Sequence, residues 1–433
     1  MGGGLMQLVA YGAQDIYLTG NPQITFFKVV YRRHTNFSME AIVQTFNGSV
    51  GTGESTVTAT ISRNGDLVSN LWLDVNLPVR GALTTGTSTY CNWTNNTGHA
   101  LIKECEIEIG GQRIDRHYSQ WLDVYNELTD HEEQEWIGLN KHAAKNSYLK
   151  SSTDTPPATR LYIPLQFWFC RNPGLALPLI ALQYHEVKLK LTTRAHKFLV
   201  NVDGTGTPAE STGTPTVDLY ADYIYLDTDE RRRFAQVSHE YLIEQVQRES
   251  GTMAASDTTQ TLNFNHPVKE LIWVVQDALC NTEGDTTSSL TGVGDATVNA
   301  GAAATANNDY FNYGAFSAGS SSEVIGGATS TEGFTDMKLQ LNGHDRFAKR
   351  NASYFRTCQP IQAGHKVPSK HVYCYSFSLK PEEHQPSGTC NFSRIDNAQM
   401  IFGSIATANL TVYAVNYNVL RIMSGMGGLA YSN

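Results

Sequence analysis

The sequence predicts an all-β protein made of two consecutive eight-stranded antiparallel jelly-roll sandwiches, a double jelly roll with long loops and a few short helices. Three observations support this fold class: the chain length, the spacing of apolar residues, and a set of segments that occurs twice. The chain has 433 residues, enough for two domains of roughly 200 residues each. Hydrophobic residues make up 41% of it and charged residues 17%, as in globular proteins whose strands are joined by polar loops.

Several short segments have the apolar spacing of β-strands. Alternation of apolar and polar residues predicts strands with one face in solvent, and it occurs in Ser55–Ile61, Lys103–Ile109, Tyr184–Leu191 and Thr411–Tyr417. Leu161–Cys170 and Val372–Leu379 carry bulky β-favouring residues on both faces, which predicts strands buried on both sides. Buried strands indicate sandwiches, and the jelly roll is the sandwich whose two facing sheets protect the strand edges.

Two segments have helical spacing instead. The longer segment, Trp121–Ile137, places its apolar residues on one side of a helix; these are Trp121, Leu122, Val124, Tyr125 and Leu128. A shorter helix is expected at Asp229–Ala235. We expect strands and loops in the rest of the chain.

Three features of the first half return in the same order in the second half. The two members of a pair predict the same local structure. In chain order, the three pairs predict a strand entry, a strand after a turn, and a strand that ends in a tight hairpin turn. The pairs are Glu40–Gln44 with Ile243–Gln247, Arg63–Leu73 with Asn265–Trp273, and Ile107–Arg113 with Leu339–Arg346. Similar segments in register indicate an internal duplication, so we infer two copies of one domain.

Long polar loops interrupt these strands. The largest is an insertion at 280–333, where Glu283–Gly333 is rich in Gly, Ala, Ser and Thr and is not expected to supply a core. A loop of this length is either disordered or functional. Its aromatic cluster favours folding onto a neighbour and consists of Tyr310, Phe311, Tyr313 and Phe316. Shorter loops of the same kind are expected at Gly81–Gly98 and Asn201–Pro215.

Charge and cysteine content exclude several classes of protein. A net charge of −9 argues against a protein that coats nucleic acid, because phosphate binding needs a basic surface. The seven cysteines form no CxxC pair, so we expect reduced thiols made in a cytosol rather than disulfides or a zinc site. We find no signal peptide, membrane-spanning run or myristoylation motif.

The sequence predicts no catalytic, metal-binding or cofactor-binding residues. The motifs GxSxG, HExxH and the phosphate-binding lysine loop do not occur. His239-Glu240 lacks a second histidine one turn later, and His185-Glu186 is expected on an alternating strand, which would point the two side chains to opposite faces. The glycines at 425–428 have no helix after them to bind a dinucleotide. We therefore expect no enzyme.

Five segments carry a resemblance to a known family. They are residues 9–37 (VAYGAQDIYLTGNPQITFFKVVYRRHTNF), Ile107–Arg116 (IEIGGQRIDR), Pro173–Val187 (PGLALPLIALQYHEV), Gln385–Asn397 (QPSGTCNFSRIDN) and Asn416–Asn433 (NYNVLRIMSGMGGLAYSN). The chain resembles the major capsid proteins of large icosahedral DNA viruses, and within that family the chlorella-virus members. The resemblance covers the framework of the whole chain and is weakest in the long loops.

The resemblance implies a structural protein that forms pseudo-hexagonal homotrimers and tiles an icosahedral shell. The implied division is an amino-terminal arm at 1–26, a first jelly roll at 27–225 and a second at 226–433. The arm would lie under the shell and touch minor capsid proteins or an inner membrane layer. Its contacts would use aromatic residues of the arm and of the segment that follows it: Tyr11, Tyr17, Phe26, Phe27 and Tyr31. Assembly would take place in the host cytoplasm.

Chlorella-virus relatives carry sugars outside the usual sequon, so the resemblance also implies glycans on the outer loops. The asparagines that we favour as attachment sites are Asn281, Asn307, Asn308 and Asn312. Two other functions remain open from the sequence. One is a minor or penton capsid protein, although such proteins usually have one jelly roll. The other is a glycan-binding, lectin-like jelly roll; a metal-dependent jelly-roll enzyme would need bound metal.

Overall fold

The computed structural model describes residues 3–10, 12–78, 83–85, 91–94, 96–129, 159–202, 207–208, 213–254, 258–276, 310–311, 313, 332–405 and 408–431. The chain divides into two compact units, Met1–Phe37 and Ser38–Asn433. The first unit contains the helices α1 (Gly3–Val9) and α2 (Ile16–Thr19), neither of which buries a side chain. We expected only strands and loops here, and that expectation was wrong for these residues. Isolated helices this short are marginal in water.

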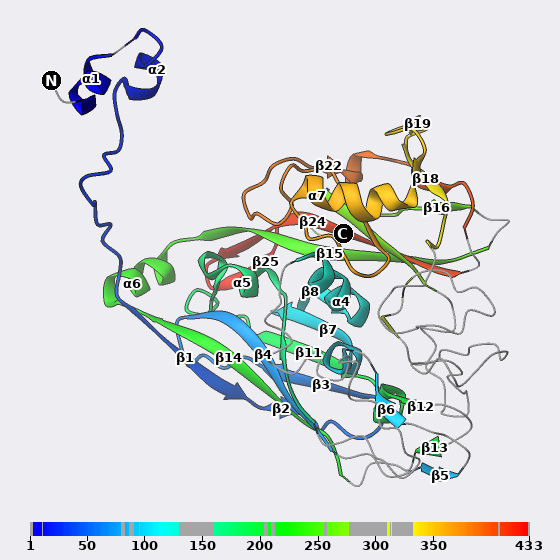
Figure 1. Ribbon diagram of the computed structural model, residues 1–433. Helices are drawn as coiled ribbons and strands as arrows, with labels where there is room; N and C mark the ends of the chain where they lie inside the picture. The colour runs from blue at the N-terminus through cyan, green and yellow to red at the C-terminus, as the bar shows by residue number, and fades with distance from the viewer. Residues whose placement is uncertain are drawn as a thin grey trace. The chain divides into compact units, whose positions relative to one another are not determined.

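The first half of the second unit forms two antiparallel sheets, drawn blue to green in Figure 1. One sheet has the order β1 (Phe37–Gln44), β14 (Thr216–Leu226), β4 (Leu67–Leu77) and β10 (Leu177–Pro178), and β9 (Thr159–Pro164) also pairs with β4. The other has the order β2 (Phe46–Asn47), β3 (Ser55–Thr60), β11 (Val187–Thr193), β7 (Ile102–Ile109) and β8 (Gln112–Tyr118). Two facing antiparallel sheets make a sandwich.

The second half repeats this arrangement. Its first sheet has the order β15 (His239–Met253), β24 (Ala408–Met423), β17 (Pro267–Gln276) and β21 (Val372–Ser376). Two short strands extend it: β22 (Cys390–Asn391) pairs with β17, and β25 (Met426–Leu429) pairs with β24. Its second sheet has the order β16 (Thr259–Thr261), β23 (Ala398–Phe402), β18 (Asp336–Leu341) and β19 (His344–Asp345), and β20 (Arg350–Asn351) also pairs with β18. Corresponding strands follow one another in the same chain order, which confirms the duplication and the all-β double jelly roll.

Side chains repeat as well as strands. Gln44 accepts a hydrogen bond from the backbone N–H of Ser62 at 2.9 Å, and Gln247 accepts one from the N–H of Asn265 at 3.0 Å. Both bonds span 18 residues. In each half this glutamine binds the first strand to the turn before the next long strand.

Both expected hairpins are present. Ile109 pairs with Gln112 across Gly110-Gly111, and Leu341 pairs with His344 across Asn342-Gly343. All four turn residues have positive φ, as a two-residue type I′ turn requires. Glycine and asparagine reach that conformation at low cost, so the sequence specifies both turns locally.

Short helices connect the strands. They are α3 (Thr97–Leu101), α4 (Ser119–Leu128), α5 (Trp168–Arg171), α6 (Thr228–Gln236), α7 (Gln359–Ala363), the 3₁₀ turns η2 (Pro173–Leu175), η3 (His196–Leu199) and η5 (Phe392–Arg394), and the π-helical turn η4 (Tyr354–Cys358). Helix α6 matches the helix expected at Asp229–Ala235 and starts at Asp227, whose carboxylate accepts the N–H of Thr228. Helix α4 ends nine residues before Ile137, because Thr129 takes extended backbone.

Two pairs of small strands join the loops expected at 81–98 and 201–215. β6 (Cys91–Trp93) pairs with β12 (Val200–Val202), and β5 (Leu83–Thr85) pairs with β13 (Thr207–Pro208). The two loops therefore lie against each other.

Three strand predictions needed correction. The run Leu161–Cys170 is not one strand buried on both sides: β9 ends at Pro164 and exposes Tyr162, and α5 follows. The strand expected at Tyr184–Leu191 begins only at Val187, so His185-Glu186 lies before it. Thr411–Tyr417 was expected to have one face in solvent, but each of its residues is buried. The other expected strands, at Ser55–Ile61, Lys103–Ile109 and the first part of Val372–Leu379, are confirmed.

Candidate functional site: the junction between the two sandwiches

The β15-β24-β17-β21 sheet is covered on both faces. Along β17, Leu271, Trp273 and Val275 point into the core of the second sandwich. The residues between them, Ile272 and Val274, belong instead to the apolar cluster of the first sandwich. Alternate residues of a strand point to opposite faces, so one face of this sheet serves its own sandwich and the other face packs on the first. This explains why Thr411–Tyr417 has no face in solvent.

Helix α4 of the first sandwich lies on this sheet. The rings of Trp121 and Tyr413 lie 5.3 Å apart, and both side chains are fully buried. The hydroxyl of Tyr413 donates to Gln120 Oε1 at 2.9 Å. Gln120 in turn donates to Gln276 Oε1 at 3.0 Å. The predicted apolar side of the helix thus packs in the junction between the two sandwiches.

Aromatic residues of the long 280–333 insertion fill the same junction. Tyr310, Phe311 and Tyr313 are at most 4% exposed and belong to the apolar cluster of the first sandwich. The guanidinium of Arg194 lies 4.1 Å above the ring of Tyr310, a favourable cation–π distance. The insertion was not expected to supply core residues, and it does so within its own chain; Phe316 lies outside the described residues.

A buried carboxylate connects this insertion to both sandwiches. Asp123 of α4 is fully buried and accepts hydrogen bonds from Tyr313 Oη at 2.8 Å and from Lys370 Nζ at 2.7 Å. Asn96 donates to Oδ1, the same oxygen that accepts from Lys370. Burial together with Asp123 raises the pKa of Tyr313 well above 10, so the phenol stays a donor. Helix α4, the long insertion and the segment around Lys370, which are far apart in sequence, therefore meet at the carboxylate of Asp123.

A second ionic network crosses the junction beside α5. Glu244 of β15 lies 2.8 Å from Arg171 of the first sandwich and 2.8 Å from Lys269 of β17. The side chains of Glu244 and Lys269 are less than 10% exposed. Arg171 also stacks on the ring of Tyr125, 4.6 Å away. Buried charges of this kind are tolerated only when they are paired and hydrogen-bonded, so the network fixes one relative placement of the sandwiches.

His365 lies between two carboxylates near this network. Its Nε2 is 2.8 Å from Glu270 and its Nδ1 is 2.6 Å from Glu382. Burial by itself would lower the pKa of His365, but the two carboxylates outweigh it and raise that pKa to about 9. Burial opposes ionisation of Glu270 as well, yet His365 holds the pKa of this carboxyl below its usual value. The pair is therefore ionised at neutral pH.

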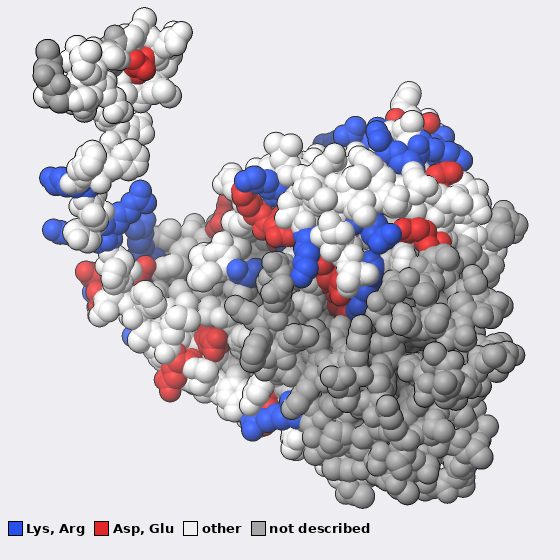
Figure 2. Space-filling model, viewed as in Figure 1, with Lys and Arg blue, Asp and Glu red and all other residues white. Residues whose placement is uncertain are grey.

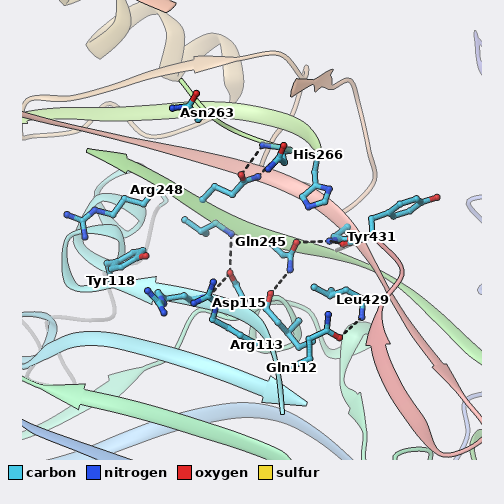
Figure 3. Close-up of a pocket in the computed structure, with 16 residues that line it drawn as sticks. Gln112, Arg113, Asp115, Tyr118, Gln245, Arg248, Asn263, His266, Leu429 and Tyr431 are labelled. Carbon is cyan, nitrogen blue, oxygen red and sulfur yellow. Dashed lines mark hydrogen bonds between the residues drawn. The ribbon is translucent and has the colours of Figure 1, made fainter. Parts of the chain in front are cut away.

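A polar groove of about 490 Å³ runs along the junction (Figure 3). Strand β8 of the first sandwich and strand β15 of the second provide much of its lining. The N–H of Val246 donates to Asp115 Oδ1 at 3.1 Å, and Gln245 donates to the carbonyl of Ile114. The N–H of Leu429 donates to Gln112 Oε1 at 3.2 Å, so strand β25 is fastened to the first sandwich too. Hydrogen bonds between the two sandwiches therefore line this groove.

The described residues offer no arrangement for metal or nucleophilic chemistry. Within them, no group of three His, Cys, Asp or Glu side chains is placed to hold a metal ion. His185 contacts the carbonyl of Gly427 through Nδ1 at 2.8 Å, which explains this histidine structurally. The cysteines Cys105, Cys170, Cys358, Cys374 and Cys390 are free. What this junction can do is hold two sandwiches rigidly in one orientation.

The residues expected to act in assembly or to carry sugars are only partly described. Four of the five aromatic residues assigned to the assembly arm, Tyr17, Phe26, Phe27 and Tyr31, are at least 86% exposed; Tyr11 lies outside the described residues. All four candidate glycosylation sites, Asn281, Asn307, Asn308 and Asn312, also lie outside them. No described helix is both long and apolar enough to cross a membrane.

Sequence reasoning missed the junction itself. One signal was available: Lys269-Glu270 interrupts the otherwise apolar run of β17, and both residues are buried. A charged pair inside a buried strand indicates partners on another element. The identity of those partners, Glu244 for Lys269 and His365 for Glu270, depends on segments other than β17.

Comparison with known proteins places the chain among viral shell proteins. One family model, described as major capsid protein N-terminus, matches residues 25–227, and another, described as large eukaryotic DNA virus major capsid protein, matches residues 230–428. The major capsid protein of Pyramimonas orientalis virus is 50% identical and that of Paramecium bursaria Chlorella virus 1 is 46% identical, each aligned over the whole of both chains.

Solved structures agree. A chain of the quasi-atomic model of the PBCV-1 virus capsid has a TM-score of 0.74 and 40% identity, covering 94% of this chain and 100% of that one. The Faustovirus major capsid protein shares the fold, with a TM-score of 0.70 at 14% identity, covering 95% of this chain and 94% of that one.

The Asp123 network gives a prediction about stability. Replacement Lys370→Met leaves the carboxylate of Asp123 buried without its cation, and we expect it to lower the free energy of unfolding by about 3–5 kcal/mol. Thermal and chemical unfolding would measure the loss. The control is Lys188→Met, which removes the partly exposed partner of Glu186 and should cost at most about 1 kcal/mol. Equal losses in the two variants would contradict a special role for Lys370.

The His365 cluster gives a prediction about pH. The folded-state pKa of about 9 lies above the ordinary 6.5, so the cluster stabilises fully below pH 6.5 and loses this contribution as pH rises to 9. The loss is on the order of 3 kcal/mol, at about 1.4 kcal/mol for each pKa unit. Melting temperature should therefore fall between pH 6.5 and 9, and His365→Gln should flatten that slope. An unchanged slope in the variant would refute the assignment.

Proposed function

The chain belongs to the major capsid protein family of large eukaryotic DNA viruses, and from this premise we propose that three copies close into a pseudo-hexagonal capsomer that tiles an icosahedral shell. The protein is a capsid component with a structural role, not an enzyme. One observation carries the proposal: the two halves have the same strand order and are locked together by the junction. A threefold ring of such chains presents six similar units.

The proposed division of the chain follows from the same symmetry. The first jelly roll comprises residues 27–225, the second comprises residues 226–433, and residues 1–26 form the arm. The two repeated sheet systems and the limits of the two matching family models support this division. Head-to-tail contacts that repeat by rotation close a ring. Six edges of similar shape then allow the tile to meet neighbours on a hexagonal lattice.

The arm is proposed to lie under the tile and to contact minor capsid proteins. Its exposed aromatic side chains support a role in burial against other protein, because large apolar surfaces left in solvent usually mark interaction sites. Synthesis and assembly are proposed to take place in the host cytoplasm. The alternatives, a minor or penton capsid protein or a lectin-like protein, have less support, because the relatives aligned over the whole chain are major capsid proteins.

Glycans on the outer loops form a separate part of the proposal. The sites proposed are Asn281, Asn307, Asn308 and Asn312, in the long insertion. Peptide mapping of protein purified from virions should find hexose-containing masses on peptides from this insertion. Unmodified asparagines throughout 280–333 would remove this part of the proposal and leave the capsid role intact.

Trimer formation predicts a native mass. Light scattering or native mass spectrometry of the purified chain should give three times its 47.7 kDa, because the exposed edges of each sandwich are completed only in the ring. A mass of 47.7 kDa at micromolar concentration would count against the trimer.

Removal of the arm predicts separate effects on the trimer and on the shell. Deletion of Met1–Gly20 should leave the protein trimeric and prevent shells from forming, because the arm is proposed to contact proteins beneath the tile. Electron microscopy of particles assembled in infected or co-expressing cells would measure the second effect. Shells of normal size and yield from the truncated chain would refute the role of the arm.

A further inference from the structure

The duplication makes it possible to compare the same sheet face in the two sandwiches. Register identifies the corresponding residues: Trp72 pairs with Tyr220 in the first sandwich, as Ile272 pairs with Tyr413 in the second. The flanking core pairs match too, since Leu71 faces Ala221 and Leu271 faces Ala414. On the neighbouring strands, Tyr162 lies beside Asp74 as Val372 lies beside Val274.

Burial differs sharply between these two faces. In the second sandwich Ile272, Val274, Val372 and Tyr413 are at most 1% exposed, because the first sandwich covers them. In the first sandwich Tyr162 is 39% exposed, and Trp72 and Tyr220 are partly exposed. The edge strands β1 and β15 show the same contrast. Val43 precedes Gln44 and is 48% exposed, whereas Val246 precedes Gln247 and is 8% exposed.

We propose that a second copy of this chain covers the outer face of the β1-β14-β4-β9 sheet, and that it does so with its β19–η4–α7 segment, residues His344–Ala363. This inference rests on the proposed trimer and identifies the surface that closes it. Within one chain, the segment after the β7–β8 hairpin, which includes α4, lies on the second sandwich's sheet. The segment after the β18–β19 hairpin is its counterpart in the duplicated domain. In the ring, this counterpart faces the first sandwich of the next copy. The contact that α4 makes within one chain is then repeated between copies.

Charge supports this choice of occupant. The face of the first sandwich carries three carboxylates, Asp74, Asp218 and Asp222, and Arg160 already pairs with Asp74 at 2.5 Å. The proposed segment carries Arg346, Lys349 and Arg350, all exposed. Figure 2 shows Lys and Arg gathered over the end of the molecule where Figure 1 places β18 and β19. Opposite charges across an interface favour one partner and one register.

One large apolar side chain on the segment also remains uncovered. Ile361 of α7 is 65% exposed, although Phe355 of η4 is buried against Trp273 in the segment's own sandwich. The segment is thus anchored on one side and open on the other. A rigid helical segment with an open apolar side suits a flat aromatic face, and aromatic residues often dominate the energy of such contacts.

The test is a face variant with a matched control. Tyr220→Arg places a charge in the middle of the proposed contact and should shift the native mass from three times 47.7 kDa to 47.7 kDa, with a rise of roughly tenfold or more in the dissociation constant. Tyr184→Arg replaces an aromatic residue that is 75% exposed elsewhere and should remain trimeric. Near-UV circular dichroism checks that both variants are folded.

Charge reversal tests the identity of the occupant. Asp218→Lys with Asp222→Lys should weaken the trimer, and the addition of Arg346→Glu with Lys349→Glu should restore it. A trimeric Tyr220→Arg variant, or dissociation of the Tyr184→Arg control as well, would overturn the assignment of the face. Failure of the second charge reversal to restore the trimer would overturn the assignment of the segment. A monomeric wild-type chain would instead refute the proposed trimer itself.

Discussion

The burial of one sheet on both faces is the constraint on which the rest of this structure depends. The β15-β24-β17-β21 sheet supplies apolar residues to its own sandwich and, from alternate positions, to the first sandwich. Neither sandwich could move relative to the other without exposing Ile272, Val274 and Tyr413. The two sandwiches therefore behave as one block in a fixed orientation, which is the property a shell tile needs.

Buried charges then determine which orientation is fixed. Apolar contact is non-directional, so by itself it would allow the sandwiches to slide or rotate on each other. The carboxylates of Asp123 and Glu244 each require cations from a defined position on another segment. Such pairs contribute little net stability, since desolvation offsets their attraction. Their value here is geometric, because a misplaced sandwich would leave several charges buried without partners.

Sequence patterns predicted local structure well, but they did not predict which segments pack against each other. The two glycine-containing hairpin turns were predictable because positive φ is a property of the residues in the turn. The end of α4 at Leu128 was not, since the helix was expected to reach Ile137. Leu161–Cys170 was taken for a buried strand because its composition is rich in β-favouring residues on both faces, but β9 ends at Pro164 and a helix follows. Of the candidate site, only Lys269-Glu270 gave a sequence signal, and no local pattern identifies Glu244 or His365 as its partners.

The sequence by itself determined that the protein is all-β, that its domain occurs twice, and that it resembles viral major capsid proteins, because alternation, turn residues and repeated segments are recorded locally along the chain. Only the tertiary structure decided which sheet is covered on both faces. Thr411–Tyr417 alternates like a strand with one wet face, yet α4 and the aromatic residues of the long insertion cover that face. An alternating pattern specifies two faces of a strand; what lies against each face depends on residues hundreds of positions away.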